Sequence, residues 1–407
     1  MSHCCRHCGS PLVHEVIDLG HQPPSNAYLT EEQLALPEIT YPLKVFVCTN
    51  CWLMQLPAHA AADQLFTPDY AYFSSTSSSW CAHAKAFVNQ AIDRLGLDQA
   101  SRVVELASND GYLLQYVKQQ GIPCLGIEPT HATAEAARAK GIETLEEFFG
   151  ISLAEKLEKA DLVVANNVLA HVPDINDFMA GVGRLLKPDG QASIEFPHLL
   201  NLLQGNQFDT IYHEHYSYIS LKAVQRISQA AGLQVVDVEQ LQTHGGSLRI
   251  WLAHQGQVDV ANSVTEVIAL EDAAGLEDFE AYAGFQQRAE KAKFSLLHFL
   301  LSSKQKGECV VGYGAAAKGN TLLNYAGVRA DLLPMVADRA LSKQGKFLPG
   351  SHIPVIAPEG LDAFKPDSVL VLPWNLIKEL TKEMPQHKLF TAIPKLQLIQ
   401  NRGGYHD

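Results

Sequence analysis

The middle of the chain alternates short apolar runs with stretches of helical periodicity. Apolar runs occupy 102–106, 124–127 and 161–165, and a further run ends at Phe196. A helical stretch follows the first run, over 112–120. Short strands that are each followed by a helix are typical of a parallel sheet covered by helices. The pattern therefore predicts an α/β domain in this region.

Two further patterns follow. Apolar alternation in 234–238 and 248–253, on either side of 243–247, predicts an antiparallel hairpin that extends the central sheet. Apolar residues three and four apart over 275–306 predict one long helix that packs between domains.

The C-terminal part begins with a second strand, turn and helix. A strand over 309–312 leads into a glycine-rich turn over 313–319 and a helix from Asn320, and Asp338 closes the following strand. Backbone amides at a helix start favour an anion. This turn is therefore a candidate phosphate site.

Composition narrows the class of protein. The chain of 407 residues has 47% apolar and 18% charged residues and a formal net charge of −13. Its length favours two or three domains, and its acidic balance argues against a nucleic-acid partner. No apolar run approaches the roughly 18 residues that span a bilayer, and the N-terminus lacks the features of a signal peptide. We therefore expect a cytoplasmic protein that binds neither nucleic acid nor membrane.

Two cysteine pairs lie near the N-terminus, Cys5-x-x-Cys8 and Cys48-x-x-Cys51. Four thiolates from two such pairs can surround a structural zinc ion and leave no open coordination position. Cys4 competes with Cys5 as a ligand, and His7 with Cys8. Four reduced thiols without a metal are the alternative.

The loop after the first strand of the middle region carries a nucleotide-type signal. The strand leads through Glu105 to Gly111, and the second strand ends at Glu128, 23 residues after Glu105. A carboxylate at that place accepts hydrogen bonds from a ribose diol. A nicotinamide site would require Gly-x-Gly-x-x-Gly in this loop, which is absent. An α/β domain without a cofactor is the remaining alternative.

Five consecutive residues that can all handle protons follow the sheet, Tyr212-His213-Glu214-His215-Tyr216. If this segment is extended, His213 and His215 share one face. Three interpretations compete: a metal site on the two histidines, histidines that are merely hydrogen-bonded at a domain junction, and general-base catalysis. Histidine titrates near neutrality, and an adjacent carboxylate would orient it, so we favour the third.

The middle region resembles the class I S-adenosylmethionine-dependent methyltransferases. The resemblance rests on Glu105 with its loop to Gly111, on Glu128, and on the segment 166–171; Ala107 stands where the family usually has glycine. It implies S-adenosyl-L-methionine as cofactor. The candidate cofactor-binding residues are Glu105, Ala107, Asn109, Gly111, Glu128, Pro129, Asn166 and Asn167.

The whole chain resembles bacterial sugar C-methyltransferases that act on nucleotide-linked keto-deoxysugars. The motifs that carry this resemblance are the two cysteine pairs, 70–75, 105–111, 212–215, 244–249 and 312–320. The resemblance implies that His215 is the base. It also implies that Tyr212, Glu214, His171 and either Tyr70 or Tyr72 line the same pocket.

The chemistry of that family explains these groups. A carbon atom becomes a nucleophile toward a sulfonium methyl group only after it loses a proton, and a neighbouring ketone makes that proton acidic. A base must take the proton, and tyrosine hydroxyls or the imidazolium of His171 should stabilise the enolate oxygen.

In the resembled family the C-terminal domain holds the sugar nucleotide. Lys318 and Asn320 are therefore candidate diphosphate contacts, and Arg249 is a candidate phosphate contact unless it is an ordinary surface arginine. Trp374 is a candidate for stacking on the base or a core residue. The full candidate set for the substrate is Arg249, Tyr313, Lys318, Asn320, Trp374 and Asn375.

We therefore predict an α/β protein with a zinc-binding domain over 1–66, a central class I methyltransferase Rossmann-like domain over 67–270, and a linking helix with a C-terminal Rossmann-like domain over 271–407. Its function would be C-methylation of a nucleoside-diphosphate 4-keto-deoxysugar alpha to the ketone. The alternatives are an NAD-dependent sugar-nucleotide oxidoreductase that uses the C-terminal glycine-rich loop, and a zinc-stabilised nucleotide-binding module that is not an enzyme.

Overall fold

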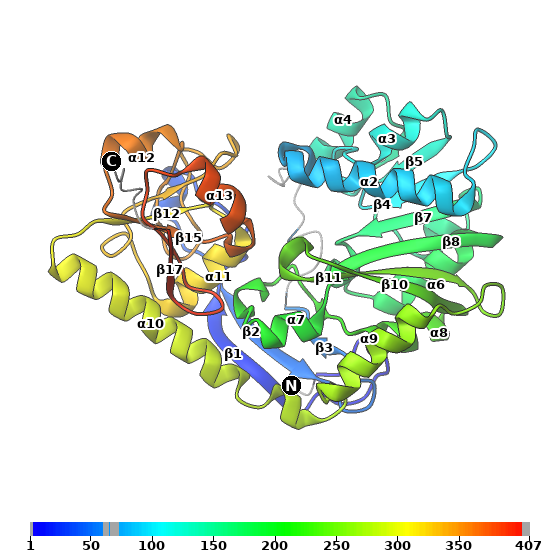
Figure 1. The fold of residues 1–407 in the computed structure, drawn as a ribbon, viewed down its shortest axis with the longest axis horizontal. Coiled ribbons are helices and arrows are strands. Elements are labelled where there is room, and N and C mark those ends of the chain that lie inside the picture. Colours follow the sequence, from blue (N-terminus) through cyan, green and yellow to red (C-terminus); the bar gives the residue numbers. More distant parts are fainter. Residues whose placement is uncertain (1–2, 60–64, 66–72, 401–407) are drawn as a thin grey trace, which may run out of the picture.

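The computed structural model describes residues 3–59, 65 and 73–400. Its strands form three sheets of four, seven and six strands. Figure 1 shows two lobes, the seven-stranded sheet in one and the six-stranded sheet in the other, with the N-terminal strands β1 and β2 running below and between them. The predicted α/β class is confirmed.

The seven-stranded sheet is the scaffold of the larger lobe. Its spatial order is β10-β11-β8-β7-β4-β5-β6. The strands are β4 Val103–Leu106, β5 Cys124–Ile127, β6 Thr144–Leu145, β7 Ala160–Asn166, β8 Leu186–Pro197, β10 Leu233–Leu241 and β11 Ser247–His254. Strands β4 to β8 are parallel, whereas β10 and β11 form the predicted antiparallel hairpin at one edge. The predicted parallel sheet and its hairpin extension are thus confirmed, and the short edge strand β6 is an addition to the prediction.

Helices cover both faces of this sheet (Figure 1). They are α2 Ser78–Leu95, α3 Leu114–Gln119, α4 His131–Ala139, α5 Ile151–Ala154, α6 Ile175–Leu185 and α8 Leu221–Ala230. The strands are buried on both faces, as a parallel sheet between helices requires. Val104, Val163 and Ile194 pack toward α6, and Val103, Leu162 and Val164 pack toward α2 and α3.

The six-stranded sheet of the second lobe has the order β14-β13-β12-β15-β16-β17. Its strands are β12 Val310–Tyr313, β13 Val336–Ala337, β14 Val355–Ile356, β15 Ser368–Val371, β16 Leu389–Thr391 and β17 Gln397–Gln400. All are parallel except β17. Helices α11 Ala317–Ala326, α12 Glu359–Phe364 and α13 Ile377–Glu383 flank it. The glycine-rich turn leads from β12 into a helix as predicted, but α11 begins at Ala317 and not at Asn320.

The N-terminal sheet joins the two lobes. It consists of β1 His14–Gln22, β2 Tyr41–Val47, β3 Met54–Gln55 and β9 Ser217–Tyr218. Strand β9 follows His215 by two residues and pairs with β3, which lies just beyond Cys51. The cysteine segment therefore supports the backbone immediately after the histidine cluster.

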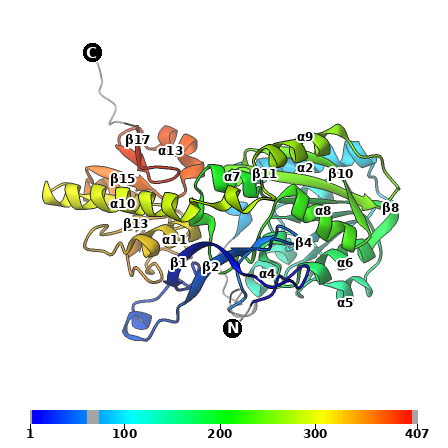
Figure 2. The same ribbon diagram turned by 90° about the horizontal axis from the view of Figure 1, so that it is seen from below.

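The single long helix predicted over 275–306 is wrong at its start. Helix α9 spans Asn262–Ala273, a 3-10 turn spans Phe279–Tyr282, and α10 runs only from Phe285 to Gln305. Gly275 and Gly284 adopt positive φ values of 69° and 74°. These left-handed residues end one helix and begin the next, although the apolar spacing runs through them. Figure 2 shows α10 alongside the second lobe.

Candidate active site

The four predicted zinc ligands come together. Every pair of Sγ atoms in the cluster lies within 4.8 Å, and Cys5–Cys51 and Cys8–Cys48 are each 3.5 Å apart. Sulfur atoms at the corners of a tetrahedron with Zn–S bonds of about 2.3 Å lie about 3.8 Å apart, so the residues fit a zinc ion. Four protein ligands would close the coordination shell, which makes the site structural.

The two competing ligands lie outside this cluster. Cys4 is exposed. The His7 ring is within 2.7 Å of Asn176 Oδ1, to which its Nδ1–H donates. A second feature favours thiolates: Gln55 Nε2 lies 3.1 Å from Cys5 Sγ and points an N–H at it.

A cavity of about 560 Å³ lies where the lobes meet. Its wall combines residues of the predicted cofactor loop, the histidine cluster and the C-terminal glycine-rich turn. They include Ala107, Asn109, Glu128, Pro129, Asn166, Asn167, His171, Tyr212, His215 and Lys318. Segments more than two hundred residues apart in the sequence thus share one chamber.

The loop after β4 is shaped by Glu128. Its carboxylate accepts the backbone N–H of Asn109 at 2.9 Å and that of Thr130 at 3.0 Å. Ala107 and Asn109 have φ values of 53° and 49°, in the left-handed region. The loop is thus curled around the carboxylate, which faces the cavity and could accept a ribose hydroxyl.

Two of the predicted cofactor residues serve the fold and do not line the cavity. Glu105 is buried below the loop, and this burial raises the pKa of its carboxyl well above the usual range. Gly111 packs against Ile142, whose Cδ1 would lie 2.4 Å from a Cβ at this position. Close packing explains the glycine better than approach to a cofactor does.

Asn166 ends strand β7, Asn167 follows it, and both line the cavity. Among the residues that the structure describes, none hydrogen-bonds the oxygen or nitrogen of either side-chain amide. Buried amides without partners are costly, so these groups fit a polar ligand in the chamber. Together with Glu128 and the curled loop, they form a donor and acceptor set that suits a nucleoside cofactor.

The 212–216 segment is a turn and not a strand, so the expected division of its side chains between two faces is wrong. The His215 Nδ1–H donates to the carbonyl of Thr210 at 2.8 Å. The carbonyl can only accept, so the proton is on Nδ1 and Nε2 carries a lone pair. Tyr212 donates its hydroxyl proton to that Nε2 at 2.8 Å. Burial lowers the pKa of His215 well below its ordinary value, which keeps the ring neutral.

His171 lies beside His215, with ring centroids 4.6 Å apart. Its Nδ1–H donates to the carbonyl of Glu214 at 2.8 Å. Burial lowers the pKa of His171 to about 4. The ring is therefore neutral near pH 7 before substrate binds, in place of the imidazolium expected from the sequence.

The Glu214 side chain does not orient His215. Its Oε1 accepts from Asn26 Nδ2 at 3.1 Å, and burial raises the pKa of the carboxyl. The Thr210 carbonyl orients His215 instead. His213 lies 3.3 Å from the carbonyl of Tyr41, so it ties the turn to β2. Among the described residues, these histidines belong to no metal-ligand cluster, since the cysteine site alone meets that description.

Of the predicted substrate residues, Lys318 lines the cavity. Its Nζ donates to Asn375 Oδ1 at 2.8 Å and lies 4.6 Å from the ring centroid of Trp374. The Trp374 Nε1–H donates to Asp209 Oδ2 at 2.7 Å. Trp374 and Asn375 thus hold Lys318 at the seam between the lobes and are not on the cavity wall.

Three other candidates for the substrate also lie off the cavity wall. Arg249 is buried in an ion pair with Glu195 at 2.8 Å. Tyr313 belongs to the buried strand β12, and Asn320 Nδ2 donates to the carbonyl of Ser25. Tyr70 and Tyr72 lie outside the described residues.

Sequence reasoning missed several residues of the wall: Asn26, Trp80, Thr210, His244 and Lys343. Each comes from a different element, and their spacing along the chain carries no common signal. His244 was within a quoted motif, and its glycine neighbours were the available clue.

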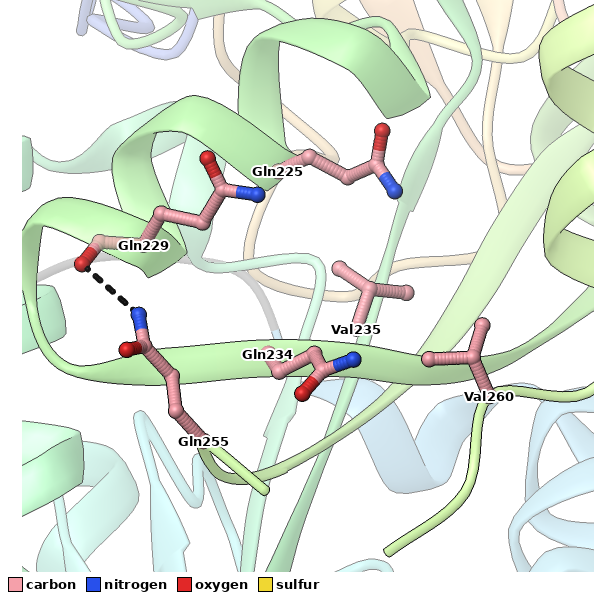
Figure 3. Close-up of a pocket in the computed structure, with 6 residues that line it drawn as sticks. All are labelled: Gln225, Gln229, Gln234, Val235, Gln255 and Val260. Carbon is pink, nitrogen blue, oxygen red and sulfur yellow. Dashed lines mark hydrogen bonds between the residues drawn. The ribbon is translucent and has the colours of Figure 1, made fainter.

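A second hollow of about 400 Å³ lies over α8 and β10 (Figure 3). It is lined by Gln225, Gln229, Gln234, Val235, Gln255 and Val260. None of these side chains titrates, so the hollow offers no acid or base.

No helix among the described residues is both long enough and apolar enough to pass through a bilayer.

Three family models match successive parts of the chain: a zinc binding domain over 5–66, a methyltransferase domain over 80–238, and a C-methyltransferase C-terminal domain over 242–392. The C-methyltransferase NovU of Streptomyces niveus is 36% identical over 381 residues, which cover 92% of this chain and 90% of NovU. The chain therefore belongs to this family of C-methyltransferases, and it is an S-adenosylmethionine-dependent enzyme with a zinc-binding N-terminal domain.

More distant similarities concern parts of the chain. The ubiquinone biosynthesis O-methyltransferase of Histophilus somni is 31% identical over 99 residues, or 22% of this chain and 42% of that protein. The PH0226 protein of Pyrococcus horikoshii superposes with a TM-score of 0.38 and 15% identity over 46% of this chain and 95% of that one. Membership in the C-methyltransferase family excludes the oxidoreductase and the non-enzymatic alternatives.

Proposed function

We propose that the enzyme removes a proton from the carbon beside the ketone of a nucleoside-diphosphate 4-keto-deoxysugar and methylates that carbon. The observation that carries this proposal is His215, whose Nε2 bears a lone pair inside the chamber that the cofactor loop also lines. When bound, S-adenosylmethionine supplies an electrophilic methyl group, which a carbanion can attack.

His215 is the proposed base. The Thr210 carbonyl fixes its tautomer, and Tyr212 occupies Nε2 until substrate arrives. Because burial keeps the ring neutral, Nε2 is available as a base at physiological pH. Protonation of His215 would strengthen the bond from Nδ1–H to Thr210, which supports proton transfer to Nε2.

The proposed diphosphate contacts are Lys318 and Lys343, which both line the chamber. Lys343 donates to the carbonyl of Ala315 at 2.8 Å and lies 3.9 Å from Asp338 Oδ2. Both lysines flank the turn before α11, where backbone amides also favour an anion. Two cations in a protein of net charge −13 support an anionic substrate at this end of the chamber.

Deuterium exchange in the absence of methyl transfer tests the base. His215→Asn should bind S-adenosylhomocysteine as the wild type does, yet lose exchange at the carbon alpha to the ketone by at least about 100-fold. His298→Asn, on the exposed face of α10, is the matched control and should exchange normally. Exchange at the wild-type rate in His215→Asn would remove His215 from this role.

A further inference from the structure

His244 occupies a strained position on the chamber wall. It lies in the turn between β10 and β11 with φ 53° and ψ 20°, in the left-handed region. The next two residues, Gly245 and Gly246, also have positive φ. A Cβ at Gly245 would lie 2.3 Å from the indole of Trp374, and one at Gly246 would lie 2.4 Å from Asn201. The turn is therefore pressed into the seam between the lobes, and His244 is held with it.

A buried charge network anchors this turn. Thr243 donates its hydroxyl proton to Glu195 Oε1 at 2.8 Å, and Glu195 Oε2 lies 2.8 Å from both Arg249 Nη2 and His83 Nε2. Glu195 and Arg249 are 0% and 3% exposed at their side chains. Burying such a pair is costly. The network fixes Thr243, and thereby the place of the adjacent His244.

The His244 ring is fixed by packing, but its nitrogens have no hydrogen-bond partner among the described residues. It packs edge-on against Trp80, with centroids 5.0 Å apart, and Trp80 stacks on His83 at 4.9 Å on another side. Among the residues that the structure describes, none hydrogen-bonds a ring nitrogen of His244. Burial, with a smaller effect of the nearby Lys318, lowers the pKa of His244 to about 4. A neutral imidazole still carries one N–H that it can donate.

Of the three histidines that line the chamber, His244 is the one whose ring N–H is accepted by no described residue. The N–H of His171 is bonded to Glu214, and that of His215 to Thr210. As the C–H bond beside the ketone breaks, its proton passes to His215 Nε2 and its electron pair forms a C=C bond. The carbonyl π pair then moves onto oxygen, which becomes negative and needs a hydrogen bond.

We propose that His244 is a further catalytic residue, which donates a hydrogen bond from its ring N–H to the substrate carbonyl oxygen as that oxygen becomes negative. No proton is transferred from His244. When the oxygen pair re-forms the C=O bond, the C=C π pair forms the bond from the alpha carbon to the methyl carbon. The carbon–sulfur pair then remains on sulfur. This inference rests on the proposed function.

Two substitutions separate the side chain from the strained backbone. His244→Gly keeps the left-handed conformation accessible and removes the donor. His244→Asn also suits that conformation and retains a shorter donor. With a keto-deoxysugar nucleotide, His244→Gly should lower the exchange rate and kcat by about 100-fold with little change in KM, and His244→Asn should recover part of the loss.

Measurements of binding, stability and kinetics together decide the result. The affinity for S-adenosylhomocysteine and the unfolding midpoint should match the wild type in both variants, and if His244→Gly does not fold, His244→Asn gives the answer. Exchange and kcat at wild-type values in a folded variant would overturn the inference, as would a rise in KM alone. In the same assay Lys318→Met should raise KM and leave kcat; the reverse pattern would make Lys318 the donor and overturn it too. Absence of exchange in the wild type would instead refute the proposed function.

Discussion

The two lobes share one local arrangement of strand, turn and helix, but the two turns suit different ligands. In the larger lobe β4 leads through a turn into α3, and Glu128 after β5 accepts the N–H groups of Asn109 and Thr130. In the smaller lobe β12 leads through a turn into α11, and Asp338 after β13 accepts the N–H groups of Ala315 and Ala340, at 2.7 and 2.8 Å. In each lobe a carboxylate curls the turn.

The difference lies in what surrounds the carboxylates. Lys318 and Lys343 stand beside the second turn, and Lys343 is 3.9 Å from Asp338. Among the described residues, no lysine or arginine forms an ion pair with Glu128. One turn therefore offers an acceptor to hydroxyl groups, and the other offers cations to an anion. The strand–turn–helix pattern thus supplies the backbone of each site, and a few side chains select the ligand.

The largest effect is expected from loss of the zinc ion, which should impair the ligand-binding turns of both lobes. Cys48→Ser should lower the zinc affinity by at least about 100-fold. Strand β3 begins just after the cysteines and pairs with β9 beside the histidine turn. Loss of the metal should therefore lower the affinities for S-adenosylhomocysteine and for the nucleoside diphosphate, and abolish deuterium exchange. Zinc content, measured by atomic emission, and calorimetry with both ligands check this. Cys4→Ser, outside the cluster, should keep its zinc; a zinc-free but fully active Cys48→Ser would contradict the prediction.

The next substitution should affect the first turn alone. Glu128→Ala removes the carboxylate that would accept the ribose hydroxyls and leaves the backbone N–H groups of Asn109 and Thr130 without their acceptor. The affinity for S-adenosylhomocysteine should therefore fall by about 10- to 100-fold. Binding of the nucleoside diphosphate should not change. Isothermal calorimetry measures both, with the exposed Glu143→Ala as control. Equal weakening of both ligands would mean that the two turns are not independent.

A smaller effect should be confined to the second turn. Lys318→Met should lower the affinity for a nucleoside diphosphate by about tenfold and leave the affinity for S-adenosylhomocysteine unchanged. Its removal also leaves the buried Asp209 without a nearby cation, which favours the protonated form of that carboxyl. Competition binding measures the effect, and Lys382→Met on the exposed face of α13 is the control. Unchanged nucleotide affinity would place the anion elsewhere.

The smallest effect concerns pH. Burial lowers the pKa of Lys318 below its usual value. A group with a lowered pKa loses its positive charge at a lower pH than an ordinary lysine, so the affinity for the anion should fall as the pH rises, before an ordinary lysine would titrate. Affinity for S-adenosylhomocysteine should stay level as the pH rises. A calorimetric pH series on the wild type and on Lys318→Met tests this, because the slope should vanish in the variant.

The sequence predicted the fold where local patterns decide it. Short apolar strands such as Val103–Leu106 are buried whichever partner covers them, so their assignment needed no tertiary information. The 275–306 helix failed because apolar spacing continues through Gly275 and Gly284, whose left-handed conformations interrupt the backbone. Arg249 failed for another reason: an arginine at the start of a strand is ambiguous until its partner, Glu195, is known.

The sequence alone determined the four zinc ligands, the alternation of strands and helices in the central sheet, and the proton-handling residues at 212–216, because spacing and residue type express them directly. Only the tertiary structure decided the protonation of His171 and His215, the place of Glu214 against Asn26, and the meeting of Lys318 and His244 across one chamber. Burial sets the pKa of an imidazole, and a carbonyl from another segment sets its tautomer. Neither can be read from neighbours along the chain.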